Sequence, residues 1–201
     1  MLLRVKKEQV LYKNMKQNNI RGILEKHPII PVVTINNEAE VEGIIKKLQD
    51  NGISCIEITL RTDYALSAIK LIKATYGEEI SVGVGTVVTK DQIDAIKALE
   101  VDFIVSPGIN ASLGEYLIDS GIPFIPGVAT PSDIILGMQM GWDTFKFFPA
   151  NLFGGIEALK TYGQVFPSVK FCPTGGITGD TYSSFLDLTN VISVGGSWMM
   201  K

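Results

Sequence analysis

An alternation of strand-like and helical segments, repeated along the whole chain, constrains this sequence more than any other feature. Eight strand-like runs are rich in Val, Ile and Phe and are bounded by turn residues. They are Ile29–Thr34, Cys55–Leu60, Ile80–Gly85, Phe103–Ser106, Pro123–Val128, Phe145–Pro149, Val169–Pro173 and Val191–Gly195. Their starts lie about 20–26 residues apart, which is the length of one strand–helix unit in a compact parallel fold.

Helix signals fill the intervals between these runs. Thr89 and Gln92 have the spacing of a capping box, in which each side chain satisfies a backbone N–H at a helix start. Thr130 followed by Pro131 fits an N-cap with proline at the first helical position. Residues 16–26 are predicted to form a further short helix before the first strand, because their apolar side chains share one helical face.

Apolar strands that alternate with helices predict a parallel sheet covered on both faces. Eight such units close naturally into a (β/α)8 TIM barrel, an α/β fold, here with an extra N-terminal helix. The main competitor is an open doubly wound sheet, but the glycine-rich loop typical of that fold is missing after the first run. Because few residues follow the final VGGSW, an eighth outer helix is expected to be missing. The uncovered apolar surface would need the N-terminal segment or a neighbouring subunit as a cover.

The length of 201 residues suits one domain with a substantial core. We assign residues 15–201 to this domain and residues 1–14, which are basic, to an N-terminal extension of unknown role. A net charge of -3 without a basic stripe argues against nucleic-acid binding. The sequence has neither an apolar run long enough to span a membrane nor a signal-peptide stretch, so we predict no membrane association and a cytoplasmic location.

Potential metal ligands are sparse and scattered. Cys55 and Cys172 lie far apart inside apolar runs, and His27 is the only histidine. A zinc-type site needs several such ligands to converge, so a metal-dependent mechanism is not expected. Both cysteines are interpreted as buried small residues in a reducing compartment.

Polar residues at the carboxyl ends of the strands are the candidates for chemistry, because active sites of this fold lie there. In IEITLRT, the residues Glu57, Thr59 and Arg61 alternate with apolar ones and therefore point to the same, interior face. The alternative is a buried structural ion pair between Glu57 and Arg61. Thr86, after the glycines of GVGTV, lies at the corresponding end of the next strand.

Lys146 is the least expected residue of a buried strand. It stands between two phenylalanines in FKFFPA, although lysine is rarely buried without a role. Burial disfavours a charged ammonium, and the neutral amine is the nucleophile that attacks ketones. The alternative, a lysine whose amine reaches solvent from an edge strand, is weak because a closed barrel has no edge strands.

Glycine pairs follow the last two strands, in CPTGGI and VGGSW. They offer backbone N–H groups where this fold usually binds phosphate, and Thr174 and Ser197 add hydroxyl donors. Tight turns without a ligand are the plainer alternative. Two glycine pairs at two adjacent strand ends favour phosphate binding.

Six motifs in this order resemble one enzyme family. IEITLRT, VGVGTV, FIPGVAT, FKFFPA, FCPTGGI and VGGSW are similar to the motifs of 2-keto-3-deoxy-6-phosphogluconate (KDPG) aldolase, whose family also cleaves 4-hydroxy-2-oxoglutarate (KHG). The likeness runs from about Met15 to Trp198 and favours the gluconate type over the galactonate type. It implies a class I lyase of carbohydrate metabolism, in the Entner–Doudoroff pathway, that gives pyruvate and glyceraldehyde 3-phosphate.

The resemblance also implies roles for individual residues. Lys146 would form the carbinolamine and then the imine, and Glu57 would move protons, partly through a water. Residues implied in binding the keto-acid end are Arg61, which would hold the carboxylate, Thr86, Thr59, Pro126 and Phe148. Residues implied in binding the phosphate are Thr174, Gly175, Gly176, Gly196 and Ser197.

The family is typically a homotrimer that acts on small keto-acid phosphosugars without a metal or other cofactor, and we expect the same here. Two alternatives stay open at this point. The substrate could be KHG, which would give pyruvate and glyoxylate, or the chain could be a non-catalytic barrel that binds a phosphorylated ligand.

Overall fold

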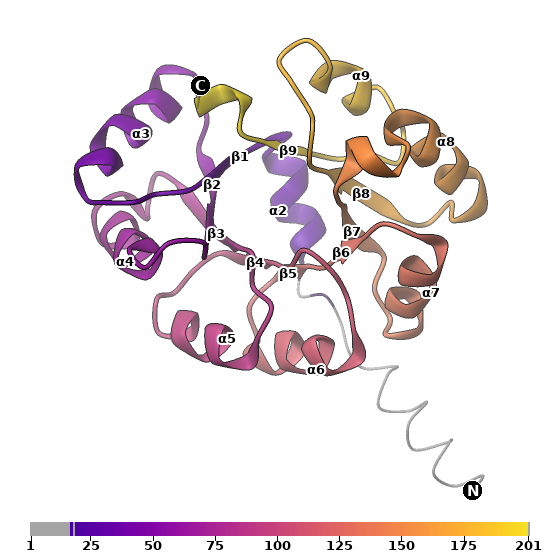
Figure 1. Ribbon diagram of the computed structural model, residues 1–201, viewed down its shortest axis with the longest axis horizontal. Coiled ribbons are helices and arrows are strands. Elements are labelled where there is room, and N and C mark those ends of the chain that lie inside the picture. Colours follow the sequence, from indigo (N-terminus) through magenta and orange to yellow (C-terminus); the bar gives the residue numbers. More distant parts are fainter. Residues whose placement is uncertain (1–16, 18, 201) are drawn as a thin grey trace, which may run out of the picture.

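The computed structural model describes Gln17 and residues 19–200. The proposed N-terminal extension, residues 1–14, lies outside the described residues. Figure 1 shows the strands arranged in a ring, with helices around the outside and α2 behind the centre of the ring. The strands are β1 Ile29–Val33, β2 Cys55–Thr59, β3 Ser81–Gly85, β4 Phe103–Val105, β5 Phe124–Ile125, β6 Gly127–Val128, β7 Thr144–Phe147, β8 Lys170–Pro173 and β9 Val194–Gly196.

Helices connect these strands on the outside of the ring. They are α3 Ala39–Asp50, α4 Ala65–Tyr76, α5 Lys90–Lys97, α6 Ala111–Ser120, α7 Pro131–Gln139, α8 Gly155–Val165 and α9 Tyr182–Leu186, with the 3-10 helix η1 Ala150–Phe153 before α8. Both predicted helix starts are confirmed: Thr89 and Gln92 form a capping box, and Thr130 caps α7 with Pro131 in its first turn. No helix within the described part of the chain has the length and apolar character needed to cross a membrane.

All strand pairs are parallel, and the sheet curls on itself. One segment has the order β5-β4-β3-β2-β1-β9 and the other the order β6-β7-β8. Isolated parallel bridges, Phe171 to Val191 and Thr174 to Gly195, link the two segments on the β8–β9 side. The fold is therefore an α/β, TIM-barrel-like arrangement.

Six predicted strands agree with the observed ones to within two residues at either end, and the other two differ more. The run Pro123–Val128 is divided into β5 and β6 at Pro126, because proline has no N–H to donate to a ladder. The last strand begins at Val194 instead of Val191, and Val191 keeps only its bridge to Phe171. In the described chain, β9 is followed by the 3-10 helix η2 Trp198–Met200, where the Trp198 ring stacks on Tyr182 with centroids 5.8 Å apart.

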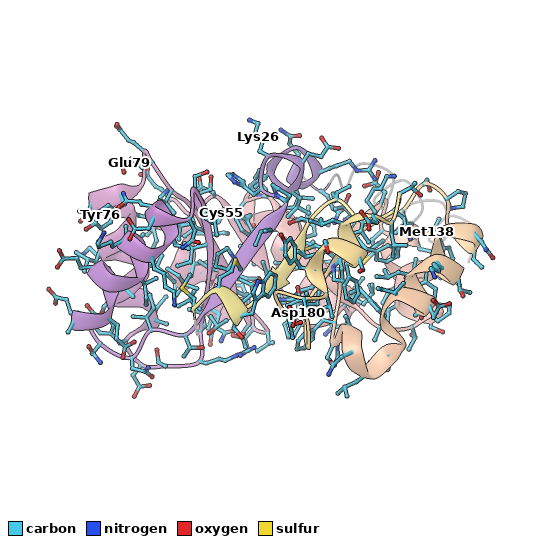
Figure 2. The ribbon with its side chains drawn as sticks, turned by 90° about the horizontal axis from the view of Figure 1, so that it is seen from above. Lys26, Cys55, Tyr76, Glu79, Met138 and Asp180 are labelled. Atoms are coloured by element: carbon cyan, nitrogen blue, oxygen red, sulfur yellow. The ribbon has the colours of Figure 1, made fainter. Side chains whose placement is uncertain are left out.

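The end of the sheet at which the strands begin is closed by α2 Ile20–Lys26, the predicted extra helix. It begins later than predicted, since Gln17 and Asn19 are not helical. Ile20 and Leu24 are almost completely buried there and pack with Ile30, Cys55 and Cys172 in one apolar cluster. Figure 2 shows α2, marked by Lys26, at one end of the strands, on the opposite side from the loop that carries Asp180. We call this the closed end.

Gln17 ties the segment before α2 to the start of β7. Its side-chain Nε2 donates to the Thr144 carbonyl at 2.6 Å, while the N–H groups of Asp143 and Thr144 donate to its Oε1 at 3.0 and 3.1 Å. Arg21 adds an ion pair to Asp143 at 3.0 Å. We call these contacts the Gln17 anchor. They fix the beginning of the strand that carries Lys146.

Candidate active site

Strand register directs the predicted catalytic pair into the interior of the sheet. On β2, Glu57 is level with Val32 and Gly83, and on β7, Lys146 is level with Gly127 and Cys172. Partners in a parallel ladder project to the same face, so one interior surface collects side chains from several strands. The predicted inward direction of Glu57 agrees with this register.

Lys146 and Glu57 meet although they lie 89 positions apart in the chain. Lys146 Nζ donates to Glu57 Oε1 at 3.1 Å and to Oε2 at 3.3 Å. Only 6% of Lys146 and 4% of Glu57 is exposed, so both charges are removed from bulk water. Removing two charges from water costs free energy, so a buried pair of this kind indicates a structural or chemical role. A proton can pass between the amine and the carboxylate across this contact.

Gly85 makes room for the carboxylate. A Cβ atom at this position of β3 would lie 2.1 Å from Glu57 Oε1, which is far inside van der Waals contact. On the other side, Lys146 Nζ lies 5.3 Å from the centroid of the Phe148 ring, within cation–π range. The Lys146 backbone N–H donates to the Pro126 carbonyl at 2.9 Å. Pro126 thus contributes a backbone contact from a buried position.

Arg61 lies apart from the buried pair. It is exposed, and its Nε donates to Thr86 Oγ1 at 3.2 Å. The structural ion pair between Glu57 and Arg61 is therefore not the arrangement found, since Glu57 contacts Lys146 instead. Thr86 has a φ of 63°, a left-handed conformation that is unfavourable for a branched side chain. Such strain is typical of residues that hold a functional group in position.

A cavity of about 730 Å³ opens beside Lys146, within the size range of small-molecule sites. Most of the residues predicted for substrate binding line it: Arg61, Lys146, Phe148, Thr174, Gly175, Gly176, Gly196 and Ser197. Glu57 reaches it through its contact with Lys146, and Thr86 through Arg61. Thr59 is completely buried and contacts the cavity-lining Thr34, whose Oγ1 lies 2.9 Å from Thr59 Oγ1.

The two glycine loops form one wall of the cavity. Gly175 and Gly176 have φ values of 103° and 71°, and a Cβ at Gly176 would lie 2.4 Å from the Asn151 side chain. These loops therefore need glycine for their shape. Thr174 Oγ1 is buried and has no partner within hydrogen-bonding distance among the described residues. The oxygen itself is shielded from the cavity, which Thr174 lines with its other atoms.

The interior thiol beside Lys146 is a poor competitor for its role. Burial raises the pKa of Cys172 to about 11, although the positive charge of Lys146 opposes the rise. The thiol therefore stays protonated at neutral pH. Within residues 17 and 19–200, no three His, Cys, Asp or Glu side chains gather as metal ligands would. Of the Cys172 thiol and the Lys146 amine, the amine is therefore the stronger candidate nucleophile.

Sequence reasoning missed several residues of the cavity. Thr34 closes the first strand-like run, so the strand-end criterion that selected Thr86 could have selected it as well. Residues of α3 also line the cavity, namely Glu40, Gly43, Ile44 and Lys47. Their spacing marks one helical face, but nothing in the sequence distinguishes a face toward a cavity from one toward the core.

Comparisons with known proteins agree with this geometry. Residues 20–201 match the family model for KDPG and KHG aldolase. The 2-dehydro-3-deoxy-phosphogluconate aldolase of Zymomonas mobilis is 40% identical over 182 residues, 90% of this chain and 86% of that protein. The KHG/KDPG aldolase of Escherichia coli is 38% identical over 188 residues, 94% of this chain and 87% of that protein.

A solved structure extends the likeness to three dimensions. The KDPG aldolase of Legionella pneumophila, crystallised with pyruvate captured as a covalent carbinolamine intermediate, superposes with a TM-score of 0.82. It is 41% identical, over 89% of this chain and 86% of that one. The motifs, the buried lysine–carboxylate pair and these matches lead to one conclusion: the chain belongs to the KDPG and KHG aldolase family.

Proposed function

We propose that this protein is a class I aldolase that reversibly cleaves KDPG to pyruvate and glyceraldehyde 3-phosphate through an imine on Lys146. The observation that carries the proposal is the buried contact between Lys146 Nζ and the Glu57 carboxylate beside a cavity of substrate size. The covalent carbinolamine of the Legionella pneumophila enzyme supports the same class of chemistry.

The proposed architecture is a single (β/α)8 barrel in which β5 and β6 count as one strand interrupted at Pro126. The bridges from Phe171 to Val191 and from Thr174 to Gly195 support closure between β8 and β9. In this arrangement η2 occupies the place after the eighth strand. Closure matters for the mechanism, because it keeps Lys146 inside a wall of strands.

Cleavage begins with attack of the Lys146 amine on the C2 ketone. The carbinolamine loses water to give a protonated imine, which acts as an electron sink. Removal of the C4 hydroxyl proton then breaks the C3–C4 bond, and the electron pair flows toward the imine nitrogen. Glyceraldehyde 3-phosphate departs, the remaining enamine is protonated at C3, and hydrolysis releases pyruvate. Glu57, at 3.1 Å from Nζ, is positioned to move these protons, partly through a water.

The keto-acid end is held by groups around Lys146. Arg61 binds the carboxylate with its planar fork, and Thr86 steadies Arg61 through the contact at 3.2 Å. The Phe148 ring and the segment at Pro126 limit the space around the reacting carbon. Thr59 contributes indirectly, because its hydroxyl contacts the hydroxyl of the cavity-lining Thr34.

The phosphate end is assigned to the wall of glycine loops. Backbone N–H groups near Gly175, Gly176 and Gly196, together with the hydroxyls of Thr174 and Ser197, would surround the phosphate oxygens. All five residues lie in the cavity wall, which supports this assignment. The resemblance adds the expectation of a homotrimer, and the sequence adds that of a cytoplasmic location. Light scattering of the purified chain tests the first.

Mass spectrometry of the intact protein tests the mechanism. Incubation with pyruvate and borohydride should add the mass of a reduced pyruvate adduct to the native chain and none to Lys146→Ala. Lys46→Ala is the matched control, since Lys46 is exposed and pairs with Asp50 on α3. Circular dichroism verifies that the variants fold. A folded native chain without an adduct would overturn the imine mechanism and favour a non-catalytic phospho-ligand barrel.

KHG is a second candidate substrate, because the Escherichia coli relative carries both activities in its name. Comparison of kcat/KM for KDPG and KHG decides between the two. We expect KDPG to be preferred, since the glycine loops offer donors that suit a phosphate. A clear preference for KHG would leave the imine chemistry intact and reverse the substrate assignment.

A further inference from the structure

A chain of hydrogen bonds fixes the Thr34 hydroxyl at the wall of the cavity. Thr34 Oγ1 lies 2.9 Å from Thr59 Oγ1, which lies 3.2 Å from the Val33 carbonyl oxygen. Thr59 is completely buried, while Thr34 lines the cavity together with Arg61 and Lys146. The chain therefore leads from a backbone acceptor to the space where the substrate binds.

The direction of this chain follows from the number of protons. A carbonyl oxygen accepts only, so the single hydroxyl proton of Thr59 is used in the bond to Val33. Thr59 must then accept from Thr34, whose own proton points away from the cavity. All three groups are satisfied in this order, as buried polar groups usually are. Thr34 Oγ1 consequently presents lone pairs, and no proton, to a ligand.

An acceptor is uncommon among the polar groups of this cavity wall. Arg61, Lys146 and the glycine N–H groups donate hydrogen bonds. The Glu40 carboxylate already accepts from Asn36, at 3.0 Å from its N–H, and from the Asn37 amide at 2.9 Å. Thr34 therefore adds a neutral acceptor to a surface that mainly attracts anions.

We infer that Thr34 is a specificity-determining residue that accepts a hydrogen bond from a substrate hydroxyl and so favours a hydroxylated phosphosugar acid over a dicarboxylate. The inference rests on the proposed function. Both substrates carry a hydroxyl at C4, so the hydroxyl in question is the one on C5 of KDPG, where KHG has a carboxylate. A hydroxyl can donate a hydrogen bond to Thr34 Oγ1. A carboxylate has no proton to donate, and its oxygens would repel the lone pairs of Thr34 Oγ1. The loss of one such bond changes discrimination by a measurable factor.

The experiment compares kcat/KM for KDPG and KHG in Thr34→Val and Thr34→Ser. Valine keeps the shape and removes the oxygen, and serine keeps the oxygen. Thr34→Val should lower kcat/KM for KDPG about 3- to 10-fold, the effect of one neutral hydrogen bond, and leave the value for KHG unchanged or higher. Thr34→Ser should keep the native ratio. Thr75→Val, an exposed threonine on α4, is the control for the substitution itself.

The outcomes separate this inference from the proposed function. If the native chain cleaves KDPG but Thr34→Val leaves the ratio unchanged, only the role of Thr34 is overturned. A larger loss for KHG than for KDPG would show that Thr34 donates and would overturn the direction of the chain. A native chain that cleaves neither substrate overturns the proposed function, and the inference with it. Thermal melts confirm that each variant is folded.

Discussion

The two ends of the curled sheet are formed by the same strands but differ in the side chains that they bury. On β2, Cys55 and Glu57 are two residues apart and share one face, yet Cys55 packs under α2 while Glu57 contacts Lys146. The closed end consists of apolar side chains such as Ile20 and Leu24. The cavity end holds a buried ion pair and, among the described residues, a buried hydroxyl without a hydrogen-bond partner. The contrast shows how one fold separates stability from chemistry.

The separation has a physical reason. Burial of apolar surface stabilises the fold in proportion to area, so the apolar cluster of the closed end stabilises the strands, and the Gln17 anchor adds polar contacts beside it. Strained backbone and unpaired polar atoms cost free energy. At the cavity end, Thr86 has the strained backbone and Thr174 the unpaired oxygen. Substitutions at the two ends should therefore affect different measurements.

The largest effect is expected from Glu57→Gln at the cavity end. The amide has the shape of the carboxylate and fits beside Gly85, but it cannot carry protons, so kcat should fall about 10²- to 10⁴-fold. Stopped-flow assay of pyruvate release measures this fall, and a urea melt reports folding. Glu157→Gln is the control, since that carboxylate is exposed and pairs with Lys160 on α8. A folded variant with near-native kcat would contradict the proton role of Glu57.

Leu24→Ala should produce the next effect, at the closed end. Loss of a completely buried side chain leaves a cavity and should lower the free energy of unfolding by about 2–5 kcal/mol. The kcat of the folded fraction should stay within about 2-fold of native if the ends are independent. Leu66→Ala, on an exposed position of α4, should cost about 0.5 kcal/mol or less. A large drop in kcat would break the comparison.

Gln17→Ala sharpens the comparison, because the Gln17 anchor joins the closed end to the strand of Lys146. The variant leaves the N–H groups of Asp143 and Thr144 without their partner and should cost about 1–3 kcal/mol of stability. Urea titration measures the cost. If β7 is held mainly by its neighbours β6 and β8, kcat stays native. A decrease in kcat would show that the position of Lys146 at the cavity end depends on the Gln17 anchor.

The smallest effect concerns Cys172, level with Lys146 on the neighbouring strand. Because burial raises its pKa from 9.0 to about 11, the native state holds the thiol proton that the unfolded state releases first. The contribution of this thiol to the free energy of unfolding should therefore be fully present below about pH 9 and be lost as the pH rises toward 11. Iodoacetamide should leave Cys172 unmodified at pH 8. Cys172→Ser should reduce this alkaline loss without abolishing it, because burial also raises the pKa of Cys55. An unchanged pH profile would assign the loss to other groups.

Local patterns predicted much of the fold and the centre of the site. Buried apolar runs and capping signals located the strands and two helix starts, and the unusual lysine in FKFFPA indicated Lys146. The partner of Glu57 was not predictable by the same means, because alternation gives a direction and not a distance across the interior. The division of a strand at Pro126 and the bridge-only contact of Val191 depend on closure between strands, which no local pattern records.

The Gln17 anchor bears on where the chain can be shortened. The family match begins at residue 20, and a crystallographer trimming the protein to that match would start it at Ile20. That cut would delete the amide that binds both backbone groups at the start of β7, together with its contacts to Asp143 and Thr144. A truncated version intended for crystals or fusions should begin before Gln17, even though the match to the family model starts after it.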